Sequence, residues 1–356
     1  MKYKLSNICE YVKGKVAVST LNTSNYISTE NMLPSKGGIV DATTLPPAET
    51  TQSYSKDDVL VSNIRPYFEK IWKANSEGGC SNDVLVFRAK PQVNPTYLYY
   101  VLSDKQFFDY ATATSKGTKM PRGDRSAIME YEIEERSRKE QDNIAAILYS
   151  LDKKIELNNK INNNLFEQAQ ALYTSMFITN ADPSWQQGRL SDLITVRYGK
   201  DHKKLADGVY PVYGSGGIMR YAERPLYEHE SVLIPRKGTL NNVMYVNESF
   251  WSVDTMFYTE MRVPNVAKFV YHFVKSKDLA SMNTGSAVPS MTTDILNAME
   301  LAIPSELALA QFENLVAPMY RAMKANDIQT AQLINLRDSI LPKLMSGELD
   351  VSTIEI

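Results

Sequence analysis

Two short segments of this sequence gather basic side chains in a pattern suited to binding nucleic acid. Residues 115–125 and residues 197–204 each carry four lysines or arginines and one aspartate, separated by Gly, Ser, Thr or Tyr. Lysine and arginine bind phosphates, and the polar side chains between them can read base edges. The candidate contacts are Lys116, Lys119, Arg122, Arg125, Lys200, Lys203 and Lys204. The alternative is that both segments are solvated surface loops.

A second set of candidates follows two apolar runs that predict strands, at residues 59–61 and 232–234. An arginine at the rigid end of a strand can direct its planar guanidinium at a guanine edge. The same arrangement occurs once in each half of the chain, which favours a shared role. The candidates in these two places are Asn63 and Arg65, and Arg236 and Lys237. Ser286 and Ser290, in the later segment that repeats residues 117–122, complete the predicted DNA contacts.

The sequence contains no combination of residues that meets the requirements of an active site. The three histidines lack metal-ligand spacing: His202, His229 and His272. Residues 214–217 are glycine-rich, but no Lys-Ser/Thr follows them as in a phosphate-binding loop. Residues 63–67 have the wrong spacing for the Asn-Pro-Pro-Tyr of adenine methyltransferases. Asp152-Lys153-Lys154 matches a nuclease-like Asp-x-Lys, but we place it on the solvated side of a helix. We therefore predict a non-catalytic chain without a metal or cofactor of its own.

The composition limits the number of domains and the way in which the chain could bind DNA. The 356 residues are 43% hydrophobic and 22% charged, which is typical of about two globular domains. The net charge of −2 means that any DNA contact must come from local basic clusters. No apolar run predicts a membrane span, and the first residues do not resemble a secretory signal. With two cysteines only, we expect a cytoplasmic protein.

The chain repeats itself once. Residues 117–121 return as residues 285–289, an offset of 168, and the same offset holds without a gap from residues 132–172 to residues 300–340. Upstream the offset drifts, which is typical of loops, whereas a constant offset indicates a regular element. We therefore predict two variable domains, at 1–136 and 184–304, each followed by a long helical spacer, at 137–178 and 305–347.

Heptad spacing predicts that both spacers are helices that pair with each other. Ser137-Arg138-Lys139-Glu140 has the spacing of a capping box. Beyond it, apolar residues alternate at intervals of four and three from position 144 to 176, and again from 312 to 344. Antiparallel pairing would place polar residues opposite one another in mid-seam and fix the register: Asn158, Asn162, Asn326 and Thr330. The alternative is that each stripe packs on a domain core.

The two domains have the same predicted layout of short strands and one amphipathic helix. Residues 83–87 and 255–258 predict further strands, and residues 96–102 and 267–274 predict helices. The expected fold class is α+β. It consists of two similar mixed α/β domains, separated by two long helices that form an antiparallel coiled coil, as an internal repeat with pseudo-two-fold symmetry.

Several motifs resemble those of type I restriction–modification specificity subunits. They are Tyr210-Pro211-Val212-Tyr213-Gly214-Ser215-Gly216-Gly217-Ile218, the run from 232 to 239 with Arg236-Lys237-Gly238, Phe250-Trp251-Ser252-Val253-Asp254-Thr255, the helical region 140–155 and the end 340–349. The first domain departs from this pattern, because it lacks the Arg-Lys-Gly and Phe-Trp segments in full.

The resemblance implies two target-recognition domains that each read half of an interrupted site in double-stranded DNA, with the helices as the spacer. Two methyltransferase subunits would methylate adenine with S-adenosylmethionine, and motor-nuclease restriction subunits would use ATP and Mg²⁺. All cofactors would belong to those partners. Two alternatives stay open: a scaffold that binds proteins rather than DNA through a coiled-coil rod, and a solitary methyltransferase.

Overall fold

The computed structural model describes residues 2–282 and 290–352 and divides into two compact units. The first unit comprises Met1–Asn158 and Asp327–Ile356, and the second comprises Asn159–Asn326. Each unit contains one β-rich domain together with part of helix α5 (Arg138–Thr174) and part of helix α9 (Glu306–Ser346). A π-helical turn, η3 (Ser175–Thr179), continues α5. None of the described helices is long and apolar enough to cross a membrane.

The β-rich domain of the first unit is built on an antiparallel sheet of order β2-β9-β6-β7. A second sheet has the order β3-β5-β8-β4, and β1 pairs with β10. The elements are β1 (Lys2–Lys4), α1 (Leu5–Ile8), β2 (Cys9–Tyr11), β3 (Lys15–Ala17), η1 (Val18–Thr20), β4 (Tyr26–Ile27), β5 (Thr50–Tyr54), β6 (Val59–Ser62), η2 (Pro66–Phe68), β7 (Ile71–Lys73), β8 (Gly78–Cys80), β9 (Val84–Ala89), α2 (Pro95–Ser103), α3 (Lys105–Ala113), α4 (Arg125–Met129) and β10 (Glu132–Glu134).

The domain of the second unit has a sheet of order β12-β18-β15-β16, a sheet of order β14-β13-β17, and the pair β11-β19. The elements are β11 (Gln187–Arg189), α6 (Leu190–Leu193), β12 (Ile194–Tyr198), β13 (Asp207–Gly214), β14 (Gly217–Ala222), β15 (Ser231–Pro235), β16 (Met244–Val246), β17 (Trp251–Ser252), β18 (Met256–Met261), α7 (Ala267–Lys275), α8 (Thr293–Asn297) and β19 (Glu300–Ala302).

The internal repeat therefore corresponds to a repeated architecture. The sheets β2-β9-β6-β7 and β12-β18-β15-β16 have the same order. In each, the strand after the first short helix (β2 or β12) pairs with the strand that comes last in the sequence (β9 or β18), and that strand also pairs with β6 or β15, which carries a predicted apolar run. Strands β6, β9, β15 and β18 and helices α2 and α7 lie where the sequence predicts them. The predicted α+β class, with two β-rich domains and two long helices packed together, is confirmed.

Helix α5 begins with the predicted capping box. The Ser137 main-chain N–H and hydroxyl both donate to Glu140, at 2.8 and 2.7 Å, and the Glu140 N–H donates to Ser137 Oγ at 3.3 Å. These bonds hold the pKa of the Glu140 carboxyl below its usual range. All predicted seam positions of both helices are buried or half-buried. The exposed Pro318 lies within α9, which continues through it.

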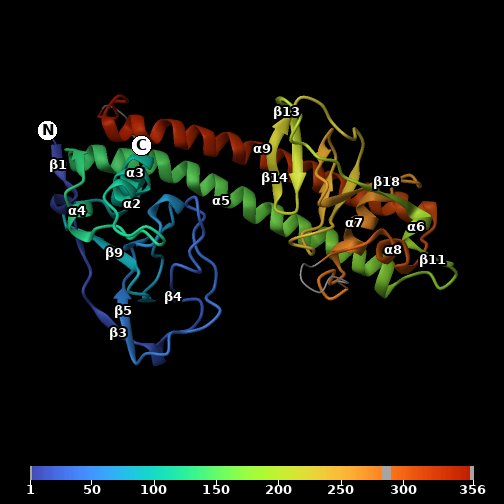
Figure 1. The fold of residues 1–356 in the computed structure, drawn as a ribbon, viewed down its shortest axis with the longest axis horizontal. Coiled ribbons are helices and arrows are strands. Elements are labelled where there is room, and N and C mark those ends of the chain that lie inside the picture. Colours follow the sequence, from blue (N-terminus) through green and yellow to red (C-terminus); the bar gives the residue numbers. More distant parts are fainter. Residues whose placement is uncertain (1, 283–289, 353–356) are drawn as a thin grey trace. The chain divides into compact units, whose positions relative to one another are not determined.

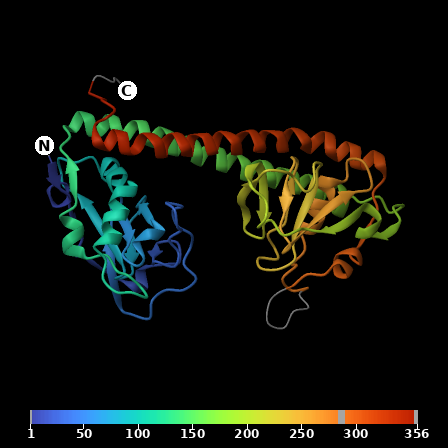
Figure 2. The same cartoon turned by 45° about the horizontal axis from the view of Figure 1, so that its top comes forward.

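Within each unit, the segments of α5 and α9 lie side by side and run antiparallel (Figures 1 and 2). In the first unit, Asn158 Nδ2 donates to Gln329 Oε1 at 3.0 Å and to Thr330 Oγ1 at 3.2 Å. In the second, Asn326 Nδ2 donates to Asn162 Oδ1 at 2.8 Å. That Asn158, Asn162, Asn326 and Thr330 set the register of the helix pair stays a prediction.

Each domain also contacts the long helices through polar groups that are buried or half-buried. In the first unit, the Tyr100 hydroxyl of α2 donates to Asp152 of α5 at 2.7 Å, and Arg337 of α9 donates to the same carboxylate at 2.8 Å. Asp152 therefore does not lie on the solvated side of its helix, as its place in the sequence predicted. The heptad numbering assigned it to a solvent-facing flank, but helix α2 covers that flank.

In the second unit, the corresponding polar contact uses a different set of side chains. His272 of α7 is fully buried, and its Nδ1 lies 2.8 Å from Gln170 Oε1 of α5. Its Nε2 lies 2.9 Å from the Tyr320 hydroxyl of α9. One helical turn earlier, the buried Lys268 Nζ donates to Glu230 and Glu313 at 2.9 and 2.8 Å. The domain is thus joined by hydrogen bonds to both helices.

Candidate nucleic-acid interface

In the first unit, predicted site residues meet at one edge of the sheet β2-β9-β6-β7, where β6 ends and β9 begins. The Asn63 N–H donates to Asp83 O at 2.8 Å, and its carbonyl accepts from Gly123 N at 3.1 Å. Two residues on, the Arg65 N–H donates to Pro121 O at 2.8 Å. The first basic segment is therefore bound along the residues that follow β6.

Three basic side chains of this segment have partners at the same edge. Arg122 forms an ion pair with Asp83 at 3.1 Å, and Lys116 forms one with Asp124 at 2.5 Å. Arg125 donates to the main-chain oxygen of Asn82 at 2.9 Å. The hydrogen bond from Lys116 is the main cause that lowers the pKa of Asp124. Because these pairs are largely exposed, each is weak, and a phosphate can compete for the cation.

Arg65 occupies a constrained position at this edge. Its φ of 50° is in the left-handed region, which a non-glycine residue adopts at a cost. The guanidinium carbon lies 6.0 Å from the centroid of the Phe68 ring. Tyr67 and Phe68 are exposed, 51% and 40%, and sequence reasoning missed them, although two aromatic residues directly after Arg-Pro are a usable signal. Asn63, by contrast, is buried, 8% exposed.

The second unit gathers its candidates at the corresponding edge of the sheet β12-β18-β15-β16. The Arg236 N–H donates to Thr255 O at 2.9 Å, and its carbonyl accepts from Met291 N at 2.9 Å. Lys237 forms a bridge with Ser290. The Lys200 N–H donates to Ser252 O at 2.8 Å, where β17 ends. Arg236, Lys237, Lys200 and Ser290 are thus fixed around the ends of neighbouring strands.

The hydrogen bonds of the two edges match, and they give the structural register of the two arginines. Gly123 N bonds Asn63 O in the first unit, and Met291 N, which is 168 residues later, bonds Arg236 O in the second. Asn63 of the first unit therefore occupies the position equivalent to Arg236 of the second unit. Gly238 of the second unit occupies the position equivalent to Arg65 of the first. Both arginines follow equivalent strands, but they leave the backbone two residues apart.

The structure does not bring every candidate to these edges. Lys119, Lys203 and Lys204 are exposed, and the Lys203 N–H donates to Asp201 Oδ1 at 3.1 Å within its own loop. Ser286 lies outside the described residues. Among those that the structure describes, no group of three His, Cys, Asp or Glu side chains could hold a metal ion.

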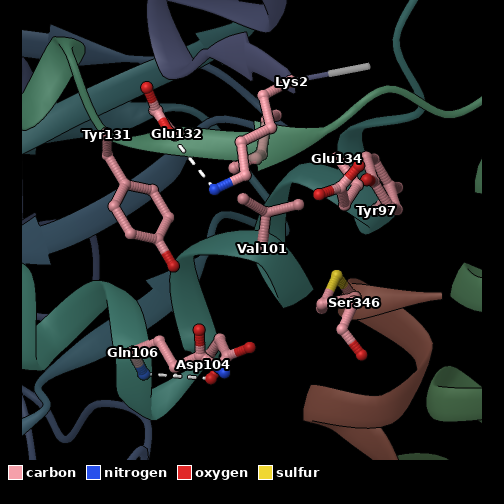
Figure 3. Close-up of a pocket in the computed structure, with 11 residues that line it drawn as sticks. Lys2, Tyr97, Val101, Asp104, Gln106, Tyr131, Glu132, Glu134 and Ser346 are labelled. Carbon is pink, nitrogen blue, oxygen red and sulfur yellow. Dashed lines mark hydrogen bonds and ion pairs between the residues drawn. The ribbon is translucent and has the colours of Figure 1, made fainter. Parts of the chain in front are cut away.

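A cavity of about 250 Å³ in the first unit shares no residue with the sheet edge. It is lined by residues of β1, α2, α3 and β10 and by the end of α9 (Figure 3). Lys2 is ion-paired with Glu132 at 3.3 Å, and Asp104 accepts from Gln106 N at 3.0 Å (Figure 3). Lys2, Glu132 and Asp104 are thus engaged in structural contacts.

The comparisons with known proteins agree with this geometry. The model of a family described as "Type I restriction modification DNA specificity domain" matches residues 1–167 and 183–309. The type I restriction enzyme MjaIX specificity subunit of Methanocaldococcus jannaschii is 26% identical over 306 residues, covering 74% of this chain and 71% of that one. The HindI specificity subunit of Haemophilus influenzae is 28% identical over 92 residues, covering 26% and 18%.

A solved structure has the same fold. The crystal structure of a type I restriction–modification system S subunit from M. genitalium superposes with a TM-score of 0.65 at 18% identity, covering 97% of this chain and 96% of that one. From its family match, this chain belongs to the DNA-specificity subunits of type I restriction–modification systems, which are not themselves catalytic.

Proposed function

We propose that each unit reads one half of an interrupted site in double-stranded DNA. In this proposal, residues 1–136 and 184–304 are the target-recognition domains, and residues 137–178 and 305–347 are the spacer that sets the number of base pairs between the half-sites. The observation that carries the proposal is the repeated sheet edge, where Arg236 directly follows β15 in the second unit and Arg65 lies three residues after the end of β6 in the first. Two similar edges in one chain suit a site with two halves.

We assign the candidate side chains to two roles. The lysines are flexible point charges, and so they position the protein on phosphates. Arg65 and Arg236 leave a backbone that is fixed by hydrogen bonds, and so they contact base edges. Arg122 and Arg125 would exchange their present partners for phosphates. Local basic clusters must supply the attraction to DNA, because the chain as a whole has a net charge of −2.

The chemistry belongs to partner subunits in this proposal. Two methyltransferase subunits would bind S-adenosylmethionine and methylate adenine, and restriction subunits would supply ATP- and Mg²⁺-dependent cleavage. The names of the M. jannaschii and H. influenzae relatives, which are specificity subunits of type I restriction enzymes, support these partners. Such an assembly would act on DNA in the cytoplasm.

The test is an exchange of one domain. Replacing residues 185–304 with the equivalent domain of a related subunit should change one half of the methylated sequence and leave the other half as it was. Methylation-sensitive sequencing of host DNA, with and without the chain, measures both halves at once. A change in both halves, or in neither, would contradict the assignment of one half-site to each domain.

A further inference from the structure

We infer that Tyr198 and Arg236 form one specificity element, in which the tyrosine ring holds the guanidinium in position to read a guanine. This inference rests on the proposed function and assigns a base to the second domain. Arg236 would be the contacting residue, and Tyr198 a positioning residue that acts through it.

The backbone of Arg236 is held on both sides. Its N–H donates to Thr255 O, and its carbonyl accepts from Met291 N, both at 2.9 Å. The preceding residue, Pro235, is the last of β15 and is buried. The side chain therefore starts from a fixed point, and only its own torsions decide where the guanidinium lies.

The guanidinium is fixed by an aromatic ring and a main-chain oxygen rather than by an acid. Its carbon lies 5.4 Å from the centroid of the Tyr198 ring, and Nη1 donates to Asp254 O at 3.2 Å. Among the described residues, no carboxylate forms an ion pair with it, whereas the nearby Arg197 is paired with Glu260 at 3.1 Å. A positive charge with remaining donors is thus held at the sheet edge without a neutralising partner.

The ring itself is well supported. Tyr198 is the last residue of β12, opposite Phe257 of β18, and the two rings meet edge to face at 5.0 Å. Tyr198 is 52% exposed, so one side of the ring packs on the sheet and the rest faces solvent. An aromatic face attracts a guanidinium and limits the planes that it can adopt, which lowers the entropy lost when the donors bind a base.

The chemistry of the donors selects guanine. A guanidinium presents two parallel N–H groups, and guanine presents O6 and N7 as two acceptors at matching spacing in the major groove. Adenine offers a donor in place of O6, so the same fork loses one bond and meets an unfavourable contact. Lysine keeps the charge but has no planar fork.

The first unit lacks this pair. Matching hydrogen bonds place Asn63 at the position of Arg236. The matching pairings Cys9↔Ala89 and Ile194↔Met261 place Lys13 at the position of Tyr198. The inference therefore applies to one half-site only, which makes the other half-site an internal control.

The experiment selects bound DNA from a library of random duplexes with the full-length chain, followed by sequencing. Four proteins are compared: wild type, Tyr198→Ala, Tyr198→Phe and Arg236→Lys. Tyr198→Phe keeps the ring and is the matched control. Thermal unfolding of each protein verifies that it is folded. In the wild-type site, the guanine assigned to Arg236 is then replaced by 7-deazaguanine, which lacks the N7 acceptor.

We expect wild type and Tyr198→Phe to select the same two half-sites. In Tyr198→Ala and Arg236→Lys, the preference for one guanine in one half-site should fall about tenfold. The 7-deazaguanine substitution should weaken binding by wild type and have little further effect on Arg236→Lys.

Three results would count against the inference, and they separate it from the proposed function. If wild type selects two half-sites and Tyr198→Ala selects the same ones, the inference is wrong and the proposed function stands. If both half-sites weaken together in the variants, the pair is structural rather than specific. If wild type selects no divided site, the proposed function itself fails.

Discussion

Replacing His272 with glutamine should remove an acid sensitivity that the structure builds into the second unit. Burial lowers the pKa of His272 from 6.5 to about 4. On acidification the unfolded imidazole takes up a proton near pH 6.5, and the folded one does so only near pH 4. The stability of the folded state is therefore unaffected above pH 6.5 and falls as the pH drops through this window.

The size of the effect follows from the two pKa values. The difference between the two pKa values corresponds to roughly 3 kcal/mol of unfolding free energy, and about 2 kcal/mol of this is already lost at pH 5. The groups around the imidazole do not offset this loss. Rings of Phe166, Tyr173 and Phe312 surround it, and the ammonium of Lys268, one turn away, is bound by two glutamates. No carboxylate forms an ion pair with the ring among the described residues.

The assay is urea unfolding at pH 8 and pH 5, followed by tryptophan fluorescence. The chain has three tryptophans, and the substitution Trp72→Phe leaves only Trp185 and Trp251, both in the second unit. In that background, His272→Gln keeps a neutral side chain that can bond Gln170 and Tyr320. We expect wild type to lose about 2 kcal/mol more than the glutamine variant between the two pH values. Parallel losses in both proteins would refute the reasoning.

Three further predictions concern the first unit and the basic loops. Asp152→Ala should destabilise the first unit by about 2–3 kcal/mol, because the Tyr100 hydroxyl and Arg337 both lose an acceptor, whereas Tyr100→Phe should cost only about 1 kcal/mol; equal losses in urea unfolding would contradict this. Ser137→Ala should cost about 1 kcal/mol, because it removes the N-cap of α5, and unchanged stability would show that packing alone fixes the helix start. Lys203→Ala should weaken binding to all duplexes and lower the salt slope by about one unit, so a loss restricted to one sequence would reassign it to base contact.

The regular parts of this fold could be predicted from the sequence, because their patterns are local. The heptads gave both long helices, and every seam position is buried or half-buried. The capping box of Ser137 and Glu140 forms as predicted. Apolar runs of three or four residues gave the central strands. In each case the periodicity of apolar side chains reflects the face that the element buries.

The candidate site could be predicted only in part, because it depends on pairings between distant segments. The basic loop around Arg122 could be identified from its composition, but its contact with the residues after β6 depends on tertiary structure. The positions of Arg65 and Arg236 differ by two residues in the structural register, which the sequence does not show because insertions separate the two halves. The stacking of Arg236 on Tyr198 joins residues 38 positions apart in the sequence, and no periodicity indicates it.

The buried hydrogen bonds between domains and helices limit how this chain can exchange parts with its relatives. His272 belongs to the second domain, but its partners Gln170 and Tyr320 belong to the long helices. In the first unit, the corresponding contact is made by Tyr100 of the domain with Asp152 of α5, which also accepts from Arg337 of α9. A new domain introduced by recombination must therefore carry a side chain that can form hydrogen bonds with the long helices already present. Otherwise polar groups of the helices are left buried without a partner. Recombination should thus succeed most often when its breakpoints keep each domain together with its own helix residues, and new DNA specificities should be inherited with them.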